Sequence, residues 1–220
     1  MGWVSGQPVF VMMSLAAALV VAHAAAANEN GTNAVGALHI ACKNGHTDAV
    51  RLLLDGGAEV DLPAQDGVTP LVIACMNGHV EVTRLLLEKG AAVDRAVEEG
   101  ATPLIVACQN GHVEVARLLL DNGAEVDRAA ENGATPLFMA CQNGHVDVAR
   151  LLLERGADDE IETAWSWWDP QRWWFRLHTP LGAAQDGARR GELGYDEIVE
   201  LIQAKQRQRH QEGTTADQEL

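Results

Sequence analysis

Apolar and polar positions along this chain form two helical patterns that return at a fixed interval. In the unit from Gly100 to Asp127, the almost entirely apolar stretch 104–108 predicts a short helix that is buried on most sides. The stretch 113–121 carries a broad apolar stripe at helical spacing, with polar residues opposite, and predicts an amphipathic helix. Each unit is therefore predicted to be a turn, a helix, a second turn, a second helix and a long loop.

The residues at the ends of these stretches are typical of helix termini. Thr102 stands where an N-cap is expected, and Pro103 occupies the first helical position, where its missing N–H costs nothing. Gly111 follows the first helix and Gly123 follows the second. Glycine is the residue that most readily takes the left-handed conformation that closes a helix. These signals support two separate helices in each unit.

The same signals recur at one constant separation, which we call the repeat period, so the chain is a tandem array. Thr-Pro-Leu segments, Gly-His pairs and all four cysteines share this period; they begin at Thr69, Thr102 and Thr135, at Gly45, Gly78, Gly111 and Gly144, and at Cys42, Cys75, Cys108 and Cys141. A unit of this size cannot bury its apolar face alone, whereas a stack of units can. Catalysis usually needs different groups that converge on one point, and a solenoid presents the same groups along a line. The repeats therefore favour a binding function.

The full pattern, Gly-x-Thr-Pro-Leu…Ala-Cys-x-Asn-Gly-His-Val-Glu-Val-x-Arg-Leu-Leu-Leu…Gly-Ala-x-Val-Asp, resembles the ankyrin repeat. The resemblance is strong over residues 34–160 and looser as far as about 203. It implies an all-α solenoid of helix pairs, with β-hairpin-like fingers and with first helices that line a concave groove for protein partners. It implies neither enzymatic activity nor a cofactor. The histidine that usually follows Thr-Pro-Leu in the family survives only as His39, with Val72, Ile105 and Phe138 elsewhere.

Five segments are expected along the chain. They are an apolar N-terminal segment, four ankyrin repeats, a Trp-rich inserted finger, a degenerate C-terminal capping repeat and a polar tail, at residues 1–33, 34–160, 161–178, 179–203 and 204–220. The break after the fourth repeat is visible in the spacing, because the interval from Gly156 to Thr179 is almost twice the interval from Gly123 to Thr135.

The N-terminal segment has three interpretations. The run from Val9 to Val21 is apolar except for Ser14, and the alanines after it are typical of a secretory signal with a cleavage region. No Lys or Arg precedes the run, and Pro8 stands just ahead of it. A degenerate repeat that caps the array is the second interpretation, and a membrane anchor is the third.

The inserted finger contains most of the aromatic residues of the chain: Trp165, Trp167, Trp168, Trp173, Trp174 and Phe175. Tryptophan buries a large area at low entropic cost and is enriched in interface hot spots. Aromatic residues at this density predict either contact with a partner or a packing cap over the last repeat. If residues 1–27 are a cleaved signal, the alternative is a secreted or membrane-surface effector whose finger contacts lipid or a foreign protein.

Other candidate partner-binding residues lie where the resemblance places the finger tips and the groove. Those at the tips and those along the first helices are Gln65, Asp66, Glu98, Glu99, Glu131 and Asn132, and Lys43, Asn44, Met76, Asn77, Gln109, Asn110, Gln142 and Asn143. The groove is predicted to be polar and weakly diversified, because repeats three and four both carry Gln-Asn at these positions.

Net charge limits the choice of partner. The chain carries 31 acidic and 16 basic residues, a net charge of −15, which makes nucleic acid a poor partner. Solubility is the simplest explanation of the acidic excess, and a protein partner with a basic surface is the sharper alternative.

The side chains that could carry chemistry do not form a recognisable site. A glycine stands between Cys and His in each Cys-x-x-x-His segment and breaks the helix, so a zinc site is not expected. Ser166 is the one serine outside the N-terminal segment, and no Gly-rich phosphate loop occurs. Each cysteine occupies the same slot of a different repeat, too far from the next for a disulfide. Free thiols suit a reducing compartment, so a cytoplasmic, non-catalytic scaffold or adaptor is predicted.

Overall fold

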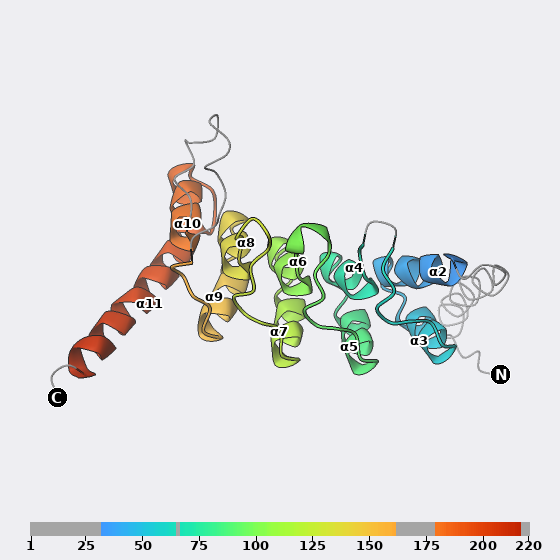
Figure 1. Cartoon of the computed structure of the whole chain (residues 1–220). Helices are drawn as coiled ribbons and strands as arrows, with labels where there is room; N and C mark the ends of the chain where they lie inside the picture. Colours follow the sequence, from blue (N-terminus) through green and yellow to red (C-terminus); the bar gives the residue numbers. More distant parts are fainter. Residues whose placement is uncertain (1–31, 65–66, 162–178, 217–220) are drawn as a thin grey trace, which may run out of the picture.

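The computed structural model describes residues 32–64, 67–161 and 179–216, and these residues form an elongated array of helix pairs (Figure 1). First helices form one row and second helices form another. The pairs are α2 (Thr32–Lys43) with α3 (Thr47–Asp55), α4 (Pro70–Met76) with α5 (Val80–Glu88), α6 (Pro103–Gln109) with α7 (Val113–Asp121), α8 (Pro136–Gln142) with α9 (Val146–Glu154), and α10 (Pro180–Arg189) with α11 (Tyr195–Ala216). A short 3-10 helix, η1 (Glu98–Gly100), lies in one finger. The expected all-α solenoid is confirmed.

The predicted start of the first helices is confirmed at atomic level. Thr102 has an extended backbone, and its side-chain oxygen accepts a hydrogen bond from the backbone N–H of Ile105 at 3.3 Å, with Pro103 at the first helical position. The threonines that precede α4, α8 and α10 cap in the same way. A threonine N-cap contributes about 1 kcal/mol to a helix. It therefore matters most for short helices such as α4, α6 and α8.

A single apolar core runs through the stack between the two rows of helices. Its largest fully buried side chains include one leucine from each of the first helices α2, α4, α6 and α8 and one from each of several second helices: Leu38, Leu71, Leu104 and Leu137, and Leu86, Leu119 and Leu152. Neighbouring first helices pack against each other more extensively than neighbouring second helices do. The row of first helices therefore lies on the tighter side of the stack.

The C-terminal pair departs from the sequence prediction. The sequence predicts that the capping repeat ends at 203 and that a polar tail follows, but α11 continues without a break to Ala216. Its continuation packs on the fourth repeat. The Lys205 ammonium donates to the backbone carbonyls of Leu153 and Ala157 at 3.0 and 2.8 Å. The helix therefore extends past the predicted boundary at 203, and polar side chains after that boundary hold it against α9.

Asp159 provides a second attachment for α11. Its carboxylate is buried, accepts a hydrogen bond from the Gln206 side chain at 2.8 Å, and forms an ion pair with Arg209. Arg150 of α9 also pairs with Glu197 of α11. These contacts make α11 a strap on the fourth repeat as far as Arg209, and Figure 1 shows the C-terminal part of the helix projecting away from the array.

Two predicted segments lie outside the described residues: most of the N-terminal segment, and all but the first residue of the Trp-rich finger. Within the described ranges, no helix combines the length and the apolar character needed to cross a bilayer.

Candidate functional site

The last residues of the first helices form a row of exposed side chains, which we call the helix-end row. It consists of Lys43, Met76, Gln109 and Gln142, which lie one repeat period apart at the C-terminal ends of α2, α4, α6 and α8. Met76 is 46% exposed, which is unusual for a large apolar residue in this array. All four members are sequence candidates for partner binding, and the structure places them at equivalent positions of successive first helices.

The backbone of each row residue is held by a side chain of the next repeat. His79, His112 and His145 each donate from Nε2 to the carbonyl of the residue 36 positions earlier, at 2.9, 3.1 and 3.0 Å. The acceptors are the carbonyls of Lys43, Met76 and Gln109. A carbonyl can only accept, so Nε2 carries the proton in each histidine. These histidines therefore have a structural role, and they fix the backbone from which each row side chain projects.

Tyr195 completes this series, and sequence analysis did not identify it. Its hydroxyl donates to the carbonyl of Gln142 at 2.8 Å, which is the contact that histidine makes in the earlier repeats. Extra residues around Arg189 and Arg190 hide this correspondence in the sequence. The signal that could have revealed it is an aromatic hydrogen-bond donor at the start of a second helix. Burial raises the pKa of the Tyr195 hydroxyl, which keeps it protonated as a donor.

These rings also explain the glycine in each Gly-His pair. Gly111 has φ +75°, and a Cβ atom built on it would lie 2.7 Å from the ring of His145. A Cβ atom on Gly144 would lie 2.8 Å from the ring of Tyr195. Any larger residue would suffer both backbone strain and a steric clash. The glycine thus allows the ring of the next repeat to pack directly on the turn that follows each first helix.

The asparagines beside the row have a structural role. Asn77, Asn110 and Asn143 each donate from the side-chain amide to a carbonyl four residues earlier in their own first helix, at 2.8 Å. Each of these carbonyls also accepts the backbone N–H of the same asparagine at 3.2 Å, so the side-chain amide adds a second donor at the end of the helix. The side chains of Gln109 and Gln142 make no such bond within the described residues. The two members of each Gln-Asn dipeptide therefore differ, and only the glutamine is left for a partner.

The fingers are short hairpin-like loops that are linked to one another. Two backbone hydrogen bonds close each turn, for example Val97 N–H to the carbonyl of Ala101 at 3.0 Å and Gly100 N–H to the carbonyl of Val97 at 3.1 Å. An aspartate at the base of one finger accepts the backbone N–H of the next: Asp61 from Ala92, Asp94 from Glu125, and Asp127 from Asp158, at 3.0–3.2 Å. The aspartate of the repeated Val-Asp pattern thus has a structural role that the sequence analysis left unassigned.

The predicted finger-tip residues differ in whether the structure describes them and in the contacts that they make. Gln65 and Asp66 lie outside the described residues, and Glu98 is placed only by its backbone in η1. Glu99 is exposed with φ 68°, and its carbonyl accepts a hydrogen bond from the backbone N–H of Glu131 at 3.0 Å. Asn132 accepts from the N–H of Ala134 through its side chain. Glu99 and Glu131 are therefore joined and exposed, whereas Asn132 stabilises its own turn.

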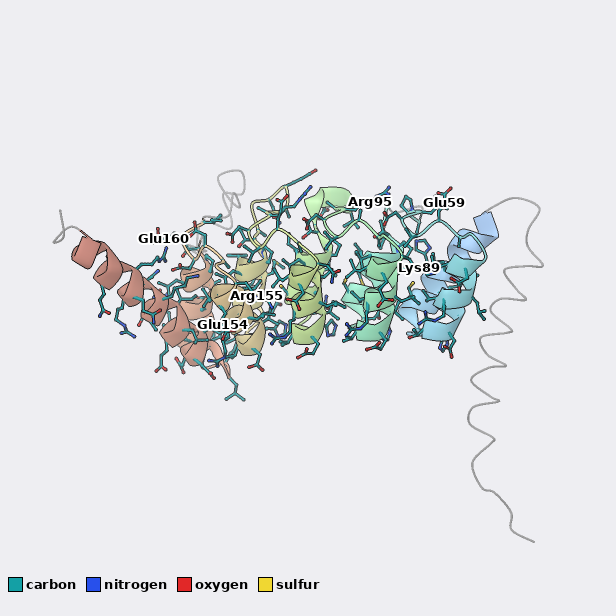
Figure 2. All side chains as sticks on the ribbon, turned by 90° about the horizontal axis from the view of Figure 1, so that it is seen from below. Glu59, Lys89, Arg95, Glu154, Arg155 and Glu160 are labelled. Atoms are coloured by element: carbon teal, nitrogen blue, oxygen red, sulfur yellow. The ribbon has the colours of Figure 1, made fainter. Side chains whose placement is uncertain are left out.

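Charged side chains line the finger edge of the array. Figure 2 shows Glu59, Arg95 and Glu160 along this edge, with Lys89 and Arg155 over the second helices. A shallow depression of about 410 Å³ lies between the 59–63 segment and Arg95. On the second helices, Lys89 pairs with Asp55 at 2.6 Å and holds the pKa of that carboxyl below its usual value. On the finger edge, Arg128 pairs with Glu125 of its own finger at 3.7 Å, and Glu160 pairs with Arg209 of α11 at 3.7 Å.

The tryptophan candidates cannot be placed on this surface. Trp165, Trp167, Trp168, Trp173, Trp174 and Phe175 all lie in 162–178, outside the described residues. That segment connects Ile161, which follows the fourth repeat, to Thr179, the N-cap of α10.

The four thiols are buried and unpaired. Burial raises the pKa of Cys42 and Cys75 to about 12, and it raises the pKa of Cys108 and Cys141 as well. A thiol that stays protonated is a poor nucleophile and a poor metal ligand. Among the described residues, no group of three or more His, Cys, Asp or Glu side chains is arranged to hold a metal ion.

Comparison with known families agrees with this geometry. A family model described as ankyrin repeats (3 copies) matches residues 12–97 and 93–163, well over half of the chain. The chain belongs to the ankyrin repeat family. A search of curated proteins finds no match. Ankyrin repeats are in general protein–protein interaction modules and are typically non-catalytic. The matched ankyrin region begins inside the apolar N-terminal segment and ends before α10. The pair of α10 and α11 lies in the region that the sequence predicts to be a degenerate capping repeat.

Proposed function

We propose that this ankyrin repeat protein is a non-catalytic scaffold or adaptor that binds a protein partner through the helix-end row and the exposed finger tips. The observation that carries the proposal is that each row residue has a fixed backbone and an exposed side chain. Ring donors of the next repeat hold the backbone of Met76, Gln109 and Gln142, while their side chains are exposed and have no hydrogen bond within the described fold. Such rigid presentation lowers the ordering cost of binding.

The partner surface that fits the finger edge is basic. Glu59, Glu99 and Glu131 are exposed along this edge, in a chain of net charge −15. Complementary charge contributes mainly to the rate and specificity of association. We therefore expect association to slow as salt is raised. We also propose a cytoplasmic location, because four unpaired thiols suit a reducing compartment.

The test compares two triple-alanine variants of the full chain in a quantitative pull-down from cell lysate. One replaces the row residues (Met76→Ala, Gln109→Ala, Gln142→Ala). The matched control replaces three exposed acidic residues on the second helices, also one repeat period apart (Glu81→Ala, Glu114→Ala, Asp147→Ala). Any protein lost only from the row variant is then purified, and its Kd is measured for the unaltered chain and both variants.

The proposal expects the row variant to weaken binding at least about tenfold while the control stays within about twofold, because interface energy is concentrated in few residues. Equal affinity for the two variants would contradict it. A third variant that replaces Trp167 and Trp168 by Ala asks whether the Trp-rich finger is an additional anchor, which we propose from its composition. If that variant alone loses the partner, the finger and not the row is the recognition element.

A further inference from the structure

The first helix pair exposes two large apolar side chains at positions that later repeats cover. Leu52 of α3 is 53% exposed, whereas Leu85 and Leu151, at the same repeat position of α5 and α9, are each 2% exposed. Ile40 of α2 is also 53% exposed, while Val106, at the same position of α6, is 7% exposed. The remaining counterparts of the two residues, Leu118 for Leu52 and Ile73 and Met139 for Ile40, are half-buried. The two residues mark an apolar face on the first repeat that lacks a partner within the described chain.

This face lies on the side where a preceding repeat would stand. The first pair has a following neighbour, because α4 and α5 pack on α2 and α3. If Leu52 faced that neighbour, α5 would cover it as completely as the rest of the stack covers Leu85. The first pair differs from the second only in having no described predecessor. Leu52 and Ile40 therefore face the N-terminal end of the stack.

The residues that precede the first pair continue the repeat period. The triplet 52–54, Leu-Leu-Leu, recurs at 85–87, 118–120 and 151–153, and one period before it stands the apolar triplet 19–21, Leu-Val-Val. Ala25 stands one period before Ala58, and its later counterparts Ala91, Ala124 and Ala157 are buried. The family match begins at residue 12, inside this stretch. Met12 and Met13 take the place of Gly-His, so the turn before this stretch differs from the others.

We propose that residues 12–25 form the second helix of an additional N-terminal repeat and cover the apolar face of Leu52 and Ile40. The segment stays in the mature protein as the first layer of the stack and is not removed as a secretory signal. Its apolar composition is explained by this position, because a second helix that covers α3 needs an apolar stripe.

The test measures whether the face is covered in the full chain. Leu52→Cys introduces a thiol at the face, and Leu193→Cys introduces one at a leucine that is 96% exposed. The four native thiols are buried, so they react slowly while the chain is folded. Each labelling rate is divided by the rate of the same variant in denaturant, which removes differences in intrinsic reactivity.

The Leu52→Cys thiol should react at least about tenfold more slowly than the Leu193→Cys thiol, because labelling requires the segment to open first. Adding Leu19→Asp and Val20→Asp to Leu52→Cys should abolish this difference. Hydrogen exchange of the α3 amides in the chain with an unaltered Leu52 gives a second readout. Exchange should accelerate when the two aspartates are introduced, even if the Leu52→Cys variant does not fold.

Three results would overturn the proposal. Equal normalised rates for Leu52→Cys and Leu193→Cys, with α3 exchange unchanged by the aspartates, would show an uncovered face. Protection that disappears on dilution would show that a second copy of the chain covers it. An intact mass that lacks the residues up to the alanine run would show that the segment is cleaved.

Discussion

The central repeats and the C-terminal helix pair make the same contact with different residues. His145 donates from its ring to the carbonyl of Gln109 at 3.0 Å, and Tyr195 donates from its hydroxyl to the carbonyl of Gln142 at 2.8 Å. Both rings lie against a glycine of the preceding turn. The comparison teaches that the geometry of the stack persists where the sequence pattern fails.

The two regions differ in how their outer edges are closed. A central repeat is covered on both sides by similar helix pairs, whereas the fourth repeat is covered by a longer helix that reaches its last carbonyls. Lys205 takes the carbonyl of Leu153, near the C-terminal end of α9, where a cation is favoured by the helix dipole. Polar contacts at this edge thus supplement the apolar core that dominates the centre.

The largest expected effect is a difference in how far the destabilisation by a core substitution spreads along the array. Leu119→Ala in the centre and Ile198→Ala in α11 each remove a fully buried side chain, and each should cost about 3 kcal/mol of unfolding free energy. Because repeats contact only their neighbours, the central loss should destabilise both flanks, and the terminal loss should stay local. Native-state hydrogen exchange measures this. Ile198→Ala should accelerate exchange in α10 and α11 alone, and uniform acceleration from both variants would show that the array unfolds as one unit.

The polar strap is tested by Arg209→Ala. Loss of this guanidinium leaves the buried Asp159 carboxylate with only Gln206 among its described side-chain donors, and breaking a buried ion pair costs about 3–5 kcal/mol. Arg209 is itself partly exposed, so we expect about 2 kcal/mol after allowing for solvent. Urea unfolding measures the cost, and Arg207→Ala, an exposed neighbour, should change stability by less than about 0.5 kcal/mol. Equal effects of the two would show that the pair contributes nothing.

The repeat pattern predicts the central helices well because each signal is local. Threonine caps, proline at the first helical position and a glycine turn act over short distances in the chain, and they place α6 and α7 close to their observed bounds. The partner of Asp159 could not be predicted in this way. Arg209 is 50 residues away along the chain, on a helix whose polar sequence is typical of a tail, and only the docking of α11 on α9 brings the two together.

The candidate site shows the same limit. The sequence identifies the Gln-Asn dipeptides of repeats three and four but does not distinguish their two members. The structure distinguishes them, because the Asn110 side chain bonds its own helix while Gln109 is exposed. The Trp-rich finger stays a prediction from composition alone.

Alkaline pH should weaken the central repeats before the C-terminal pair. The unfolded thiols ionise near pH 9, and the buried ones only near 12 for Cys42 and Cys75, so their stabilising contribution is complete below pH 9 and is lost as the pH rises above it. Each such thiol should reduce the unfolding free energy by about 1.4 kcal/mol per pH unit in this window. In α10 the equivalent position is Gln185.

The measurement is the slope of stability against pH just above the point where the unfolded thiols ionise. Cys75→Ala should make this slope shallower by the contribution of one thiol, and a Gln185→Ala control should leave it unchanged. An unaltered slope in Cys75→Ala would mean that the thiol ionises equally in the folded and unfolded chain.

The smallest effect concerns the contact with which the comparison began. Tyr195→Phe keeps the ring against Gly144 but leaves the carbonyl of Gln142 without its donor, which should cost about 1 kcal/mol in urea unfolding. Tyr195→Ala should cost more, because it also removes the packed ring. If Tyr195→Phe is neutral, the ring packing alone carries the junction, and the hydrogen bond that unites the tyrosine with the histidines is incidental. If Tyr195→Phe costs as much as Tyr195→Ala, the bond itself fixes the last pair, and the central histidines should then be equally sensitive to loss of their Nε2 donor.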